Sequence, residues 1–320
     1  MDEELVTLGD PSLSFSRSLI LGKGNYGVVF SGKYRGKDVA VKRIELERMN
    51  QREEALFQLD HEHVVKLYHW RDNKDFRFYV LELCAANLDE YCKGCYTGPI
   101  PSEAEVLYQL ATGLEYIHLK RLHRDIKPKN ILISKPDPIV RIKWADFGSS
   151  KLVNDNGSCS MSGVRGTKDW TAPEHIRLLG ASCRGSKPSD IFSAGLVFFY
   201  FLKKVHPFGE DSEIESNIKN NQPVNIDDLA HHFAKPVVIK MIAHEAKDRM
   251  ALEEIIRKLK PFLPPNPPGD VETSMQPSLS LQDGRWCLQS YVSPNNTPAT
   301  LTCLMTYAVG NYNTSEESHI

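Results

Sequence analysis

Residues 123–130 read His-Arg-Asp-Ile-Lys-Pro-Lys-Asn, and residues 146–148 read Asp-Phe-Gly. The first stretch places a carboxylate at Asp125, an ammonium group at Lys127 and an amide oxygen at Asn130 on one short loop. Asp125 is suited to accept a hydroxyl proton, and Lys127 to steady a phosphoryl group during transfer. Asn130 and Asp146 offer the hard oxygen ligands that Mg²⁺ prefers. These residue types indicate phosphoryl transfer, which depends mainly on positioning and on neutralising phosphate charge.

The composition is that of an ordinary globular chain of 320 residues. Its 39 basic and 41 acidic side chains give a formal net charge of -2, so we expect no general attraction to nucleic acid or to anionic membranes. The acidic start Met-Asp-Glu-Glu does not have the order of a signal peptide. The longest apolar run, residues 191–202, is shorter than the roughly 20 residues that a membrane-spanning helix needs, so we expect a buried core helix and no membrane segment.

The seven cysteines are odd in number and scattered, which favours a reducing compartment over a disulfide framework. We therefore expect a cytoplasmic protein. Cys92 and Cys95 have a spacing seen in metal sites, but no second pair accompanies them, so we expect no zinc site.

A glycine pattern, Gly-x-Gly-x-x-Gly, occurs at Gly22, Gly24 and Gly27. Backbone N–H groups can approach phosphate oxygens closely at such positions. The pattern alone also fits a dinucleotide-binding fold, in which a helix would follow. Here a turn at 34–36 and a third strand at 38–44 follow instead, which favours a nucleotide-binding β lobe.

Lys42 lies on that third strand in the context Ala-Val-Lys, where we expect it to contact the α- and β-phosphates of ATP. A glutamate on the next helix, expected at 46–59, would hold Lys42 in place. We favour Glu53, because two apolar residues follow it at the i+3 and i+4 positions. Glu54 remains an alternative.

Residues 64–70 and 76–83 are rich in β-branched and aromatic residues and complete five predicted strands. An adenine ring could then pair with backbone groups and lie between apolar walls. The residues expected there are Glu82 and Cys84 for the pairing and Val29 and Ala40 for the walls. From residue 89 onward the pattern becomes helical, with a capping box at 102–105.

Residues 17–263 resemble a eukaryotic protein kinase, because the catalytic motifs of that family occur in order. The resemblance implies a two-lobed α+β fold, with a small five-stranded β lobe carrying one helix and a larger, mainly α lobe. The expected divisions are an N-lobe at 17–83, a hinge at 84–88 and a C-lobe at 89–263. ATP and Mg²⁺ are the implied cofactors and proteins the implied substrates. Lys127 matches the serine/threonine-specific pattern.

Three further stretches, 82–91, 163–170 and 189–209, resemble the inositol-requiring-enzyme family of endoplasmic-reticulum stress sensors, in which a kinase is fused to an endoribonuclease. This implies a signalling role and allows for a homodimer. An alternative hypothesis is a nucleotide-binding scaffold or dimerisation platform with incidental catalysis. If the chain is a fragment of a longer sensor, the expected location is the cytosolic face of the endoplasmic reticulum.

The kinase resemblance also implies a Glu174–Arg249 pair and an anchoring role for Asp190 beneath the catalytic loop. Arg124, next to the catalytic Asp125, could bind a phosphate carried by residues 149–171. We therefore predict that phosphorylation of that segment switches activity. The candidate acceptors are Ser158, Ser160, Ser162 and Thr167.

The two ends of the chain differ from its middle. Residues 1–16 read as a loose leader, with ordered structure expected from Arg17. Residues 264–320 are rich in Pro, Ser and Asn and read as a disordered tail, with a short strand near 301–307. This tail contains one arginine, one histidine and no lysine, whereas RNA binding depends on cationic side chains, so we expect neither nucleic-acid binding nor RNA cleavage.

Overall fold

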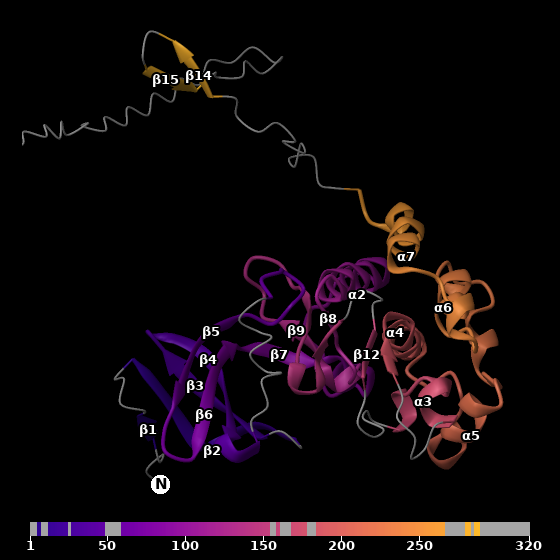
Figure 1. Cartoon of the computed structure of the whole chain (residues 1–320), viewed down its shortest axis with the longest axis horizontal. Coiled ribbons are helices and arrows are strands. Elements are labelled where there is room, and N and C mark those ends of the chain that lie inside the picture. Colours follow the sequence, from indigo (N-terminus) through magenta and orange to yellow (C-terminus); the bar gives the residue numbers. More distant parts are fainter. Residues whose placement is uncertain are drawn as a thin grey trace, which may run out of the picture. The chain divides into compact units, whose positions relative to one another are not determined.

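The computed structural model describes residues 5–7, 12–24, 27–48, 59–153, 158–160, 168–177, 184–265, 279–282 and 285–288. The chain divides into two compact units, Met1–Pro264 and Pro265–Ile320. The first unit contains an antiparallel sheet followed by a mainly helical part (Figure 1). The described part of the second unit is a hairpin of β14 (Leu279–Gln282) and β15 (Arg285–Leu288), which we did not predict.

The antiparallel sheet has six strands in the order β1-β2-β3-β4-β6-β5. These strands are β1 (Leu5–Thr7), β2 (Leu13–Gly24), β3 (Gly27–Tyr34), β4 (Lys37–Glu45), β5 (Leu67–Asp72) and β6 (Phe76–Glu82). The five expected strands are all present, and β1 adds a sixth at one edge. One face of the sheet has its own small core, which includes Phe15, Phe30, Val41 and Val80.

Regular structure begins earlier than we expected. Residues 5–7 pair with residues 14–16, and β2 already begins at Leu13. The described parts of residues 1–16 are therefore not the loose leader that we expected. Leu13 and Phe15 are 0% and 2% exposed. They alternate with serines in the strand period of two, and burial of these two side chains gives the segment a reason to join the sheet.

The rest of the first unit is mainly helical. Its α-helices are α1 (Leu88–Cys92), α2 (Glu103–His118), α3 (Pro173–Arg177), α4 (Lys187–Lys203), α5 (Ile214–Lys219), α6 (Lys235–Met241) and α7 (Leu252–Leu259). Its short strands are β7 (Cys84–Asn87), β8 (Arg121–Leu122), β9 (Ile131–Ser134), β10 (Ile142–Trp144), β11 (Lys151–Leu152), β12 (Ser158–Ser160) and β13 (Arg184–Ser186). The 3-10 helices of this unit are η1 (Leu46–Arg48), η3 (Pro128–Asn130), η4 (Phe147–Ser149), η5 (Lys168–Trp170), η6 (Asp211–Glu213), η7 (Ile226–Leu229), η8 (Ala246–Asp248) and η9 (Lys260–Phe262).

Two predicted helices are confirmed. The first, α2, begins with the expected capping box, in which the Glu105 N–H donates to the Ser102 hydroxyl and the Ser102 N–H donates to the Glu105 carboxylate. The second, α4, contains the apolar run and is buried along most of its length. None of the helices in the described ranges is long and apolar enough to cross a membrane.

A three-stranded sheet in the order β10-β9-β7 lies where the chain leaves the larger sheet. The segment expected to be a hinge, residues 84–88, is largely the strand β7, whose Cys84 pairs with Ser134 of β9. Strand β9 directly follows the loop at residues 123–130, and β10 ends two residues before Asp146. This small sheet therefore brings the expected adenine-binding segment and both expected metal ligands to neighbouring strands.

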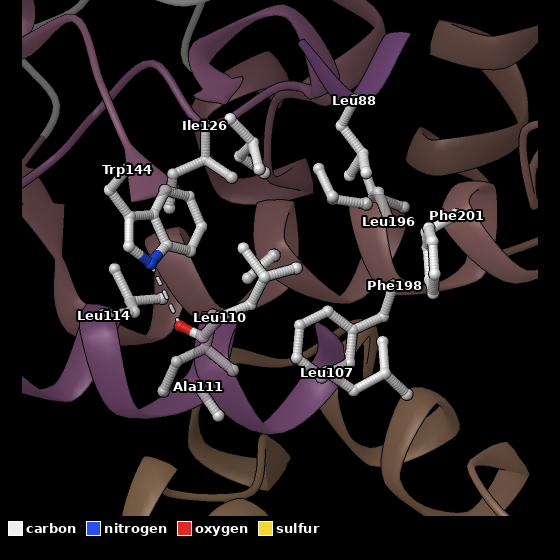
Figure 2. Packing of buried hydrophobic residues seen from close by; sticks show 14 of the residues in the cluster. Leu88, Leu107, Leu110, Ala111, Leu114, Ile126, Trp144, Leu196, Phe198 and Phe201 are labelled. Carbon is white, nitrogen blue, oxygen red and sulfur yellow. Dashed lines mark hydrogen bonds between the residues drawn. The ribbon is translucent and has the colours of Figure 1, made fainter. Parts of the chain in front are cut away.

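The core of the helical part is continuous from α2 to α4 (Figure 2). Leu107 and Leu110 of α2 are 0% and 1% exposed, and they lie close to Phe198 of α4 and to Trp144. Trp144 is itself fully buried. Apolar burial at roughly 25 cal/mol per Å² is the main force that holds these elements together.

We predict that Gly195→Ala lowers stability, because a Cβ atom there would lie 2.7 Å from the Met241 Cβ and 2.8 Å from the Ile242 Cγ2. Alanine normally stabilises a helix interior by about 0.5–1 kcal/mol relative to glycine, whereas overpacking costs about 1–3 kcal/mol. We expect a net loss of about 1–2 kcal/mol in urea unfolding. Ser216→Ala, on the exposed face of α5, is the control and should have little effect. A Gly195→Ala variant as stable as the natural protein would contradict this close packing.

Candidate active site

A buried carboxylate holds the backbone of the loop at residues 123–130. Asp190, in α4, is 4% exposed, and its side chain accepts hydrogen bonds from the His123 N–H at 2.7 Å and the Arg124 N–H at 3.0 Å. The His118 Nε2 atom lies 3.0 Å from the same carboxylate. Burial by itself would raise the pKa of Asp190, but the hydrogen bond and charge of His118 and the bond from His123 hold that pKa below its ordinary value. The predicted anchoring role is confirmed.

The structure brings together the three predicted residues of the catalytic loop. The Lys127 ammonium group donates to the two oxygens of Asp125 at 3.1 and 2.9 Å. The Asn130 Nδ2 group donates to the Asp125 carbonyl at 2.8 Å and to its carboxylate at 2.9 Å. The Asp125 carboxylate is therefore held in one orientation. Because the nitrogen of the Asn130 amide is bonded, its oxygen is directed away from Asp125 and can serve as a metal ligand.

Lys42 and Asp146 meet although they are 104 residues apart in the chain. Strand β4 places Lys42 between Val29 of β3 and Tyr79 of β6, and the Lys42 Nζ atom lies 3.0 Å from the Asp146 Oδ1. Burial alone would raise the pKa of Asp146, but the adjacent Lys42 ammonium group keeps it below its ordinary value. Asp146 is therefore anionic, and the pair joins the sheet to the mainly helical part.

Asp146 has a left-handed backbone, with φ of +60°, and the residues around it are packed against His123. The His123 ring lies 5.1 Å from the Phe147 ring, and its Nε2–H donates to the Ala145 carbonyl at 3.0 Å. Burial lowers the pKa of His123, so the ring is neutral. The neutral ring fixes the chain immediately before Asp146 without adding a charge to the site.

The oxygen atoms present fit a Mg²⁺ ion. Asp146 is anionic, the Asn130 amide oxygen is directed away from its bonded nitrogen, and the Ala145 N–H donates to the Asn130 carbonyl at 2.9 Å. That bond ties the two ligand-bearing segments to each other. Mg²⁺ is commonly held by one or two protein oxygens together with substrate phosphates and water, which is the number of ligands available here.

The glycine pattern lies in the hairpin of β2 and β3, where Gly24 pairs with Gly27. A Cβ atom at Gly27, whose φ is +142°, would lie 2.1 Å from the Arg43 carbonyl oxygen, so only glycine fits there. Gly22 and Gly24 instead border open space. They leave the backbone accessible to a ligand.

The Glu82 side chain is bonded to two other parts of the chain. Its carboxylate accepts from the Lys66 N–H at 3.2 Å and forms an ion pair with Lys143 of β10 at 3.0 Å. Cys84 is a neutral thiol, because burial raises its pKa to about 12. Val29 and Ala40, the expected apolar walls, lie on the adjacent strands β3 and β4, and Ala40 is buried.

The predicted Glu174–Arg249 pair, which lies just after residues 149–171, is confirmed. The Arg249 guanidinium donates to both oxygens of Glu174, at 2.8 and 2.7 Å, and its side chain is 0% exposed. Burial would raise the pKa of Glu174, but the bidentate contact with Arg249 lowers it below the ordinary value. The pair secures the segment that follows the expected phosphorylation sites.

Several predicted residues cannot be placed in this way. Glu53, Glu54, Ser162 and Thr167 lie outside the described residues, as does the strand expected near 301–307. Ser158 and Ser160 lie in β12, which pairs with β13.

Sequence reasoning also missed two residues beside the site, Lys143 and Trp144. Their position directly before the Asp-Phe-Gly motif was the available signal, but it did not indicate what they contact.

Comparison with known proteins agrees with this geometry. The model of the protein kinase domain family matches residues 15–260. The human serine/threonine-protein kinase/endoribonuclease IRE2 is 36% identical over 279 residues, which cover 83% of this chain and 28% of that protein. The Caenorhabditis elegans serine/threonine-protein kinase/endoribonuclease ire-1 is 33% identical, covering 76% and 27%. The Hypocrea jecorina serine/threonine-protein kinase/endoribonuclease IRE1 is 32% identical, covering 74% and 23%.

The chain thus spans about a quarter of the length of these curated relatives. The family match and the sheet followed by a helical part confirm the predicted two-lobed α+β kinase fold. The match extends over most of the chain and includes each motif described above. The chain belongs to the protein kinase domain family, and its kinase domain is similar to those of the IRE1-type kinase/endoribonucleases.

Proposed function

We propose that the protein is a serine/threonine protein kinase, which transfers the γ-phosphoryl group of ATP to hydroxyl groups of protein substrates with the help of Mg²⁺. The observation that carries this proposal is the 3.0 Å contact between Lys42 and Asp146. The contact joins a cation suited to phosphate with an anion suited to Mg²⁺, directly beside the Asp125 loop. The similarity to serine/threonine-protein kinase/endoribonucleases supports the hydroxyl groups of serine and threonine as the acceptors.

Each residue has one task in this mechanism. Asp125 accepts the proton of the attacking hydroxyl, and its two hydrogen-bond donors keep its carboxylate in one orientation. Lys127 stabilises the phosphoryl group during its transfer, and Lys42 binds the α- and β-phosphates. Asn130 and Asp146 would hold Mg²⁺, which supplies neutralisation of the phosphate charge when it is bound. The glycine-rich hairpin and the backbone near Glu82 and Cys84 would bind the rest of ATP.

Arg124 supports regulation by phosphorylation of the segment at residues 149–171. Its backbone is left-handed, with φ of +69°, and its Nε and Nη1 atoms are buried without a hydrogen-bond partner among the residues that the structure describes. A guanidinium group with two buried N–H-bearing atoms in this state favours an anion, and a phosphate can accept from two of its N–H groups at once. Autophosphorylation of the segment would supply that anion.

A stress-sensor-like signalling role is the finer part of the proposal. It rests on the resemblance of residues 82–91, 163–170 and 189–209 to the endoplasmic-reticulum stress sensors, as do a homodimeric state and a location at the cytosolic face of the endoplasmic reticulum. The alternative function, a nucleotide-binding scaffold or dimerisation platform, uses the same binding residues but does not need Asp125 as a base. Substitution of Asp125 therefore separates the two functions.

We predict that Asp125→Asn reduces phosphoryl transfer by roughly 100-fold or more, because the amide cannot accept the hydroxyl proton. Binding of Mg²⁺ and ADP should persist, since Asp125 is not one of the proposed ligands. Transfer from labelled ATP to the protein itself and to a generic acceptor protein measures the change. Lys129→Ala is the control, because Lys129 is exposed on the same loop. Transfer at the natural rate by Asp125→Asn would contradict the kinase proposal.

Lys42→Met should lower transfer by at least about 100-fold, because the phosphates lose a cation in a shielded site. Lys33→Met is a suitable control. Lys33 lies on the neighbouring strand in an exposed ion pair with Asp38, and such pairs contribute little. Steady-state kinetics over a range of ATP concentrations distinguish the two variants. Equal activity of both would refute the role of Lys42.

For the activation segment, we expect phosphopeptide mapping after incubation with ATP to find phosphate within residues 149–171. Combined alanine substitution of the four candidate acceptors, Ser158, Ser160, Ser162 and Thr167, should reduce activity by about tenfold. A loss of this size is what we expect when one charge-assisted hydrogen bond between a phosphate and Arg124 is removed. Arg124→Gln should produce a similar loss, with no further loss when the substitutions are combined. An unmodified segment together with full activity of the quadruple variant would rule out the switch.

A further inference from the structure

Strand β10, which leads into Asp146, contains only three residues. Its ladder pairs with β9 through Ile142, Lys143 and Trp144. A ladder of this length supplies few hydrogen bonds, whereas a metal ligand must be held within a fraction of an ångström. Contacts other than the ladder therefore also contribute to the position of Asp146.

Trp144 supplies such contacts, since it is fully buried and hydrogen-bonded to two other parts of the chain. Its indole N–H donates to the Leu110 carbonyl of α2 at 3.1 Å (Figure 2). Its backbone N–H donates to the His63 carbonyl at 2.9 Å, and its carbonyl accepts from the Val65 N–H at 2.9 Å. Because residues 63–65 lead into β5, Trp144 joins the sheet lobe to a helix of the other lobe.

Gly113 of α2 provides the space in which the indole lies. A Cβ atom at position 113 would lie 2.7 Å from the Trp144 Cδ1, 2.9 Å from its Nε1 and 2.9 Å from the His63 Cβ. Any larger residue at 113 must therefore displace the indole ring and the adjacent His63 side chain. The His123 ring also lies near the indole, at 5.6 Å between centroids. The indole ring thus contacts both α2 and the start of the loop at residues 123–130.

Ala145, the residue between Trp144 and Asp146, links the position of Trp144 to the proposed metal site through two hydrogen bonds. Its N–H donates to the Asn130 carbonyl, and its own carbonyl accepts from the His123 ring. The proposed metal ligands, Asn130 and Asp146, are therefore linked through the peptide that begins at Trp144. A shift of the indole would change the separation of the two ligand oxygens.

We propose that Trp144 is a positioning residue for the metal site, whose indole ring, in contact with Gly113 and bonded to Leu110, sets the place of Asp146 relative to Asn130. This inference rests on the proposed function, because it takes those two residues as Mg²⁺ ligands. Mg²⁺ requires nearly ideal octahedral geometry, so a small displacement of one ligand weakens its binding. If Trp144 were only a core residue, its substitution would lower stability but would not change how ADP binding depends on Mg²⁺ concentration.

The test uses Trp144→Leu and Trp144→Phe in the full chain, with ADP binding measured by calorimetry across a Mg²⁺ titration. For Trp144→Leu we expect the Mg²⁺ concentration at half-maximal ADP binding to rise by roughly 10- to 100-fold, the usual effect of removing a group that orients a metal ligand. Trp144→Phe keeps an aromatic ring but loses the N–H donor, and should give a smaller rise in the same direction.

Phe198→Leu is the matched control, because Phe198 is a buried aromatic residue of the same core that packs beside Leu107 instead (Figure 2). It should lower the thermal midpoint without changing the Mg²⁺ dependence. If both Trp144 variants behave like this control, Trp144 is a core residue only and the proposal is overturned. The kinase proposal fails separately, if the natural protein binds Mg²⁺ and ADP but transfers no phosphate.

A second measurement tests the contact with Gly113. Gly113→Ala should lower both the thermal midpoint and the Mg²⁺ affinity of the natural protein, since the added methyl group displaces the indole ring. In the Trp144→Leu background the same substitution should cause a smaller loss of Mg²⁺ affinity, because the indole ring is absent and only the contact with the His63 Cβ remains. Equal losses in the two backgrounds would overturn the coupling between Gly113 and Trp144.

Discussion

The buried carboxylate of Asp190 is the constraint on which the catalytic geometry depends. Burying an ionised carboxylate is costly unless its oxygens are hydrogen-bonded, and here the His123 and Arg124 N–H groups and the His118 ring satisfy them. The loop must adopt a single conformation to make these bonds, with the left-handed backbone of Arg124 as part of it. That conformation then presents the side chains of Asp125, Lys127 and Asn130 on one side.

Ion pairs and buried aromatic packing have different roles around the loop at residues 123–130. Ion pairs such as Lys42–Asp146 and Glu174–Arg249 set the protonation and orientation of groups that must be charged. Buried aromatic contacts, in which His123 lies between Trp144 and Phe147, hold the backbone from which those groups project. Neither is sufficient alone, because an unpaired charge would be costly to bury and a loosely packed strand would not hold its ligand.

Much of the fold could be predicted because its signals are local. The Gly-x-Gly-x-x-Gly hairpin, the Ser102 capping box and the apolar run in α4 each depend on spacings within a few residues. The prediction failed at the N-terminus, where the alternation of Leu13 and Phe15 with serines was too short to indicate a strand by itself. Their burial against the sheet is what makes residues 13–24 a strand.

The sequence by itself determined which chemical groups are available to the site, since Lys42, Asp125, Asn130 and Asp146 occur in motifs whose order and spacing predict their roles. Only the tertiary structure decided which distant groups hold them. The Glu82–Lys143 pair, the bond from Trp144 to Leu110 and the space at Gly113 join residues from separate elements. Such contacts depend on how strands and helices pack in three dimensions. The periodicity within a single segment does not encode which residues of other segments will lie next to it.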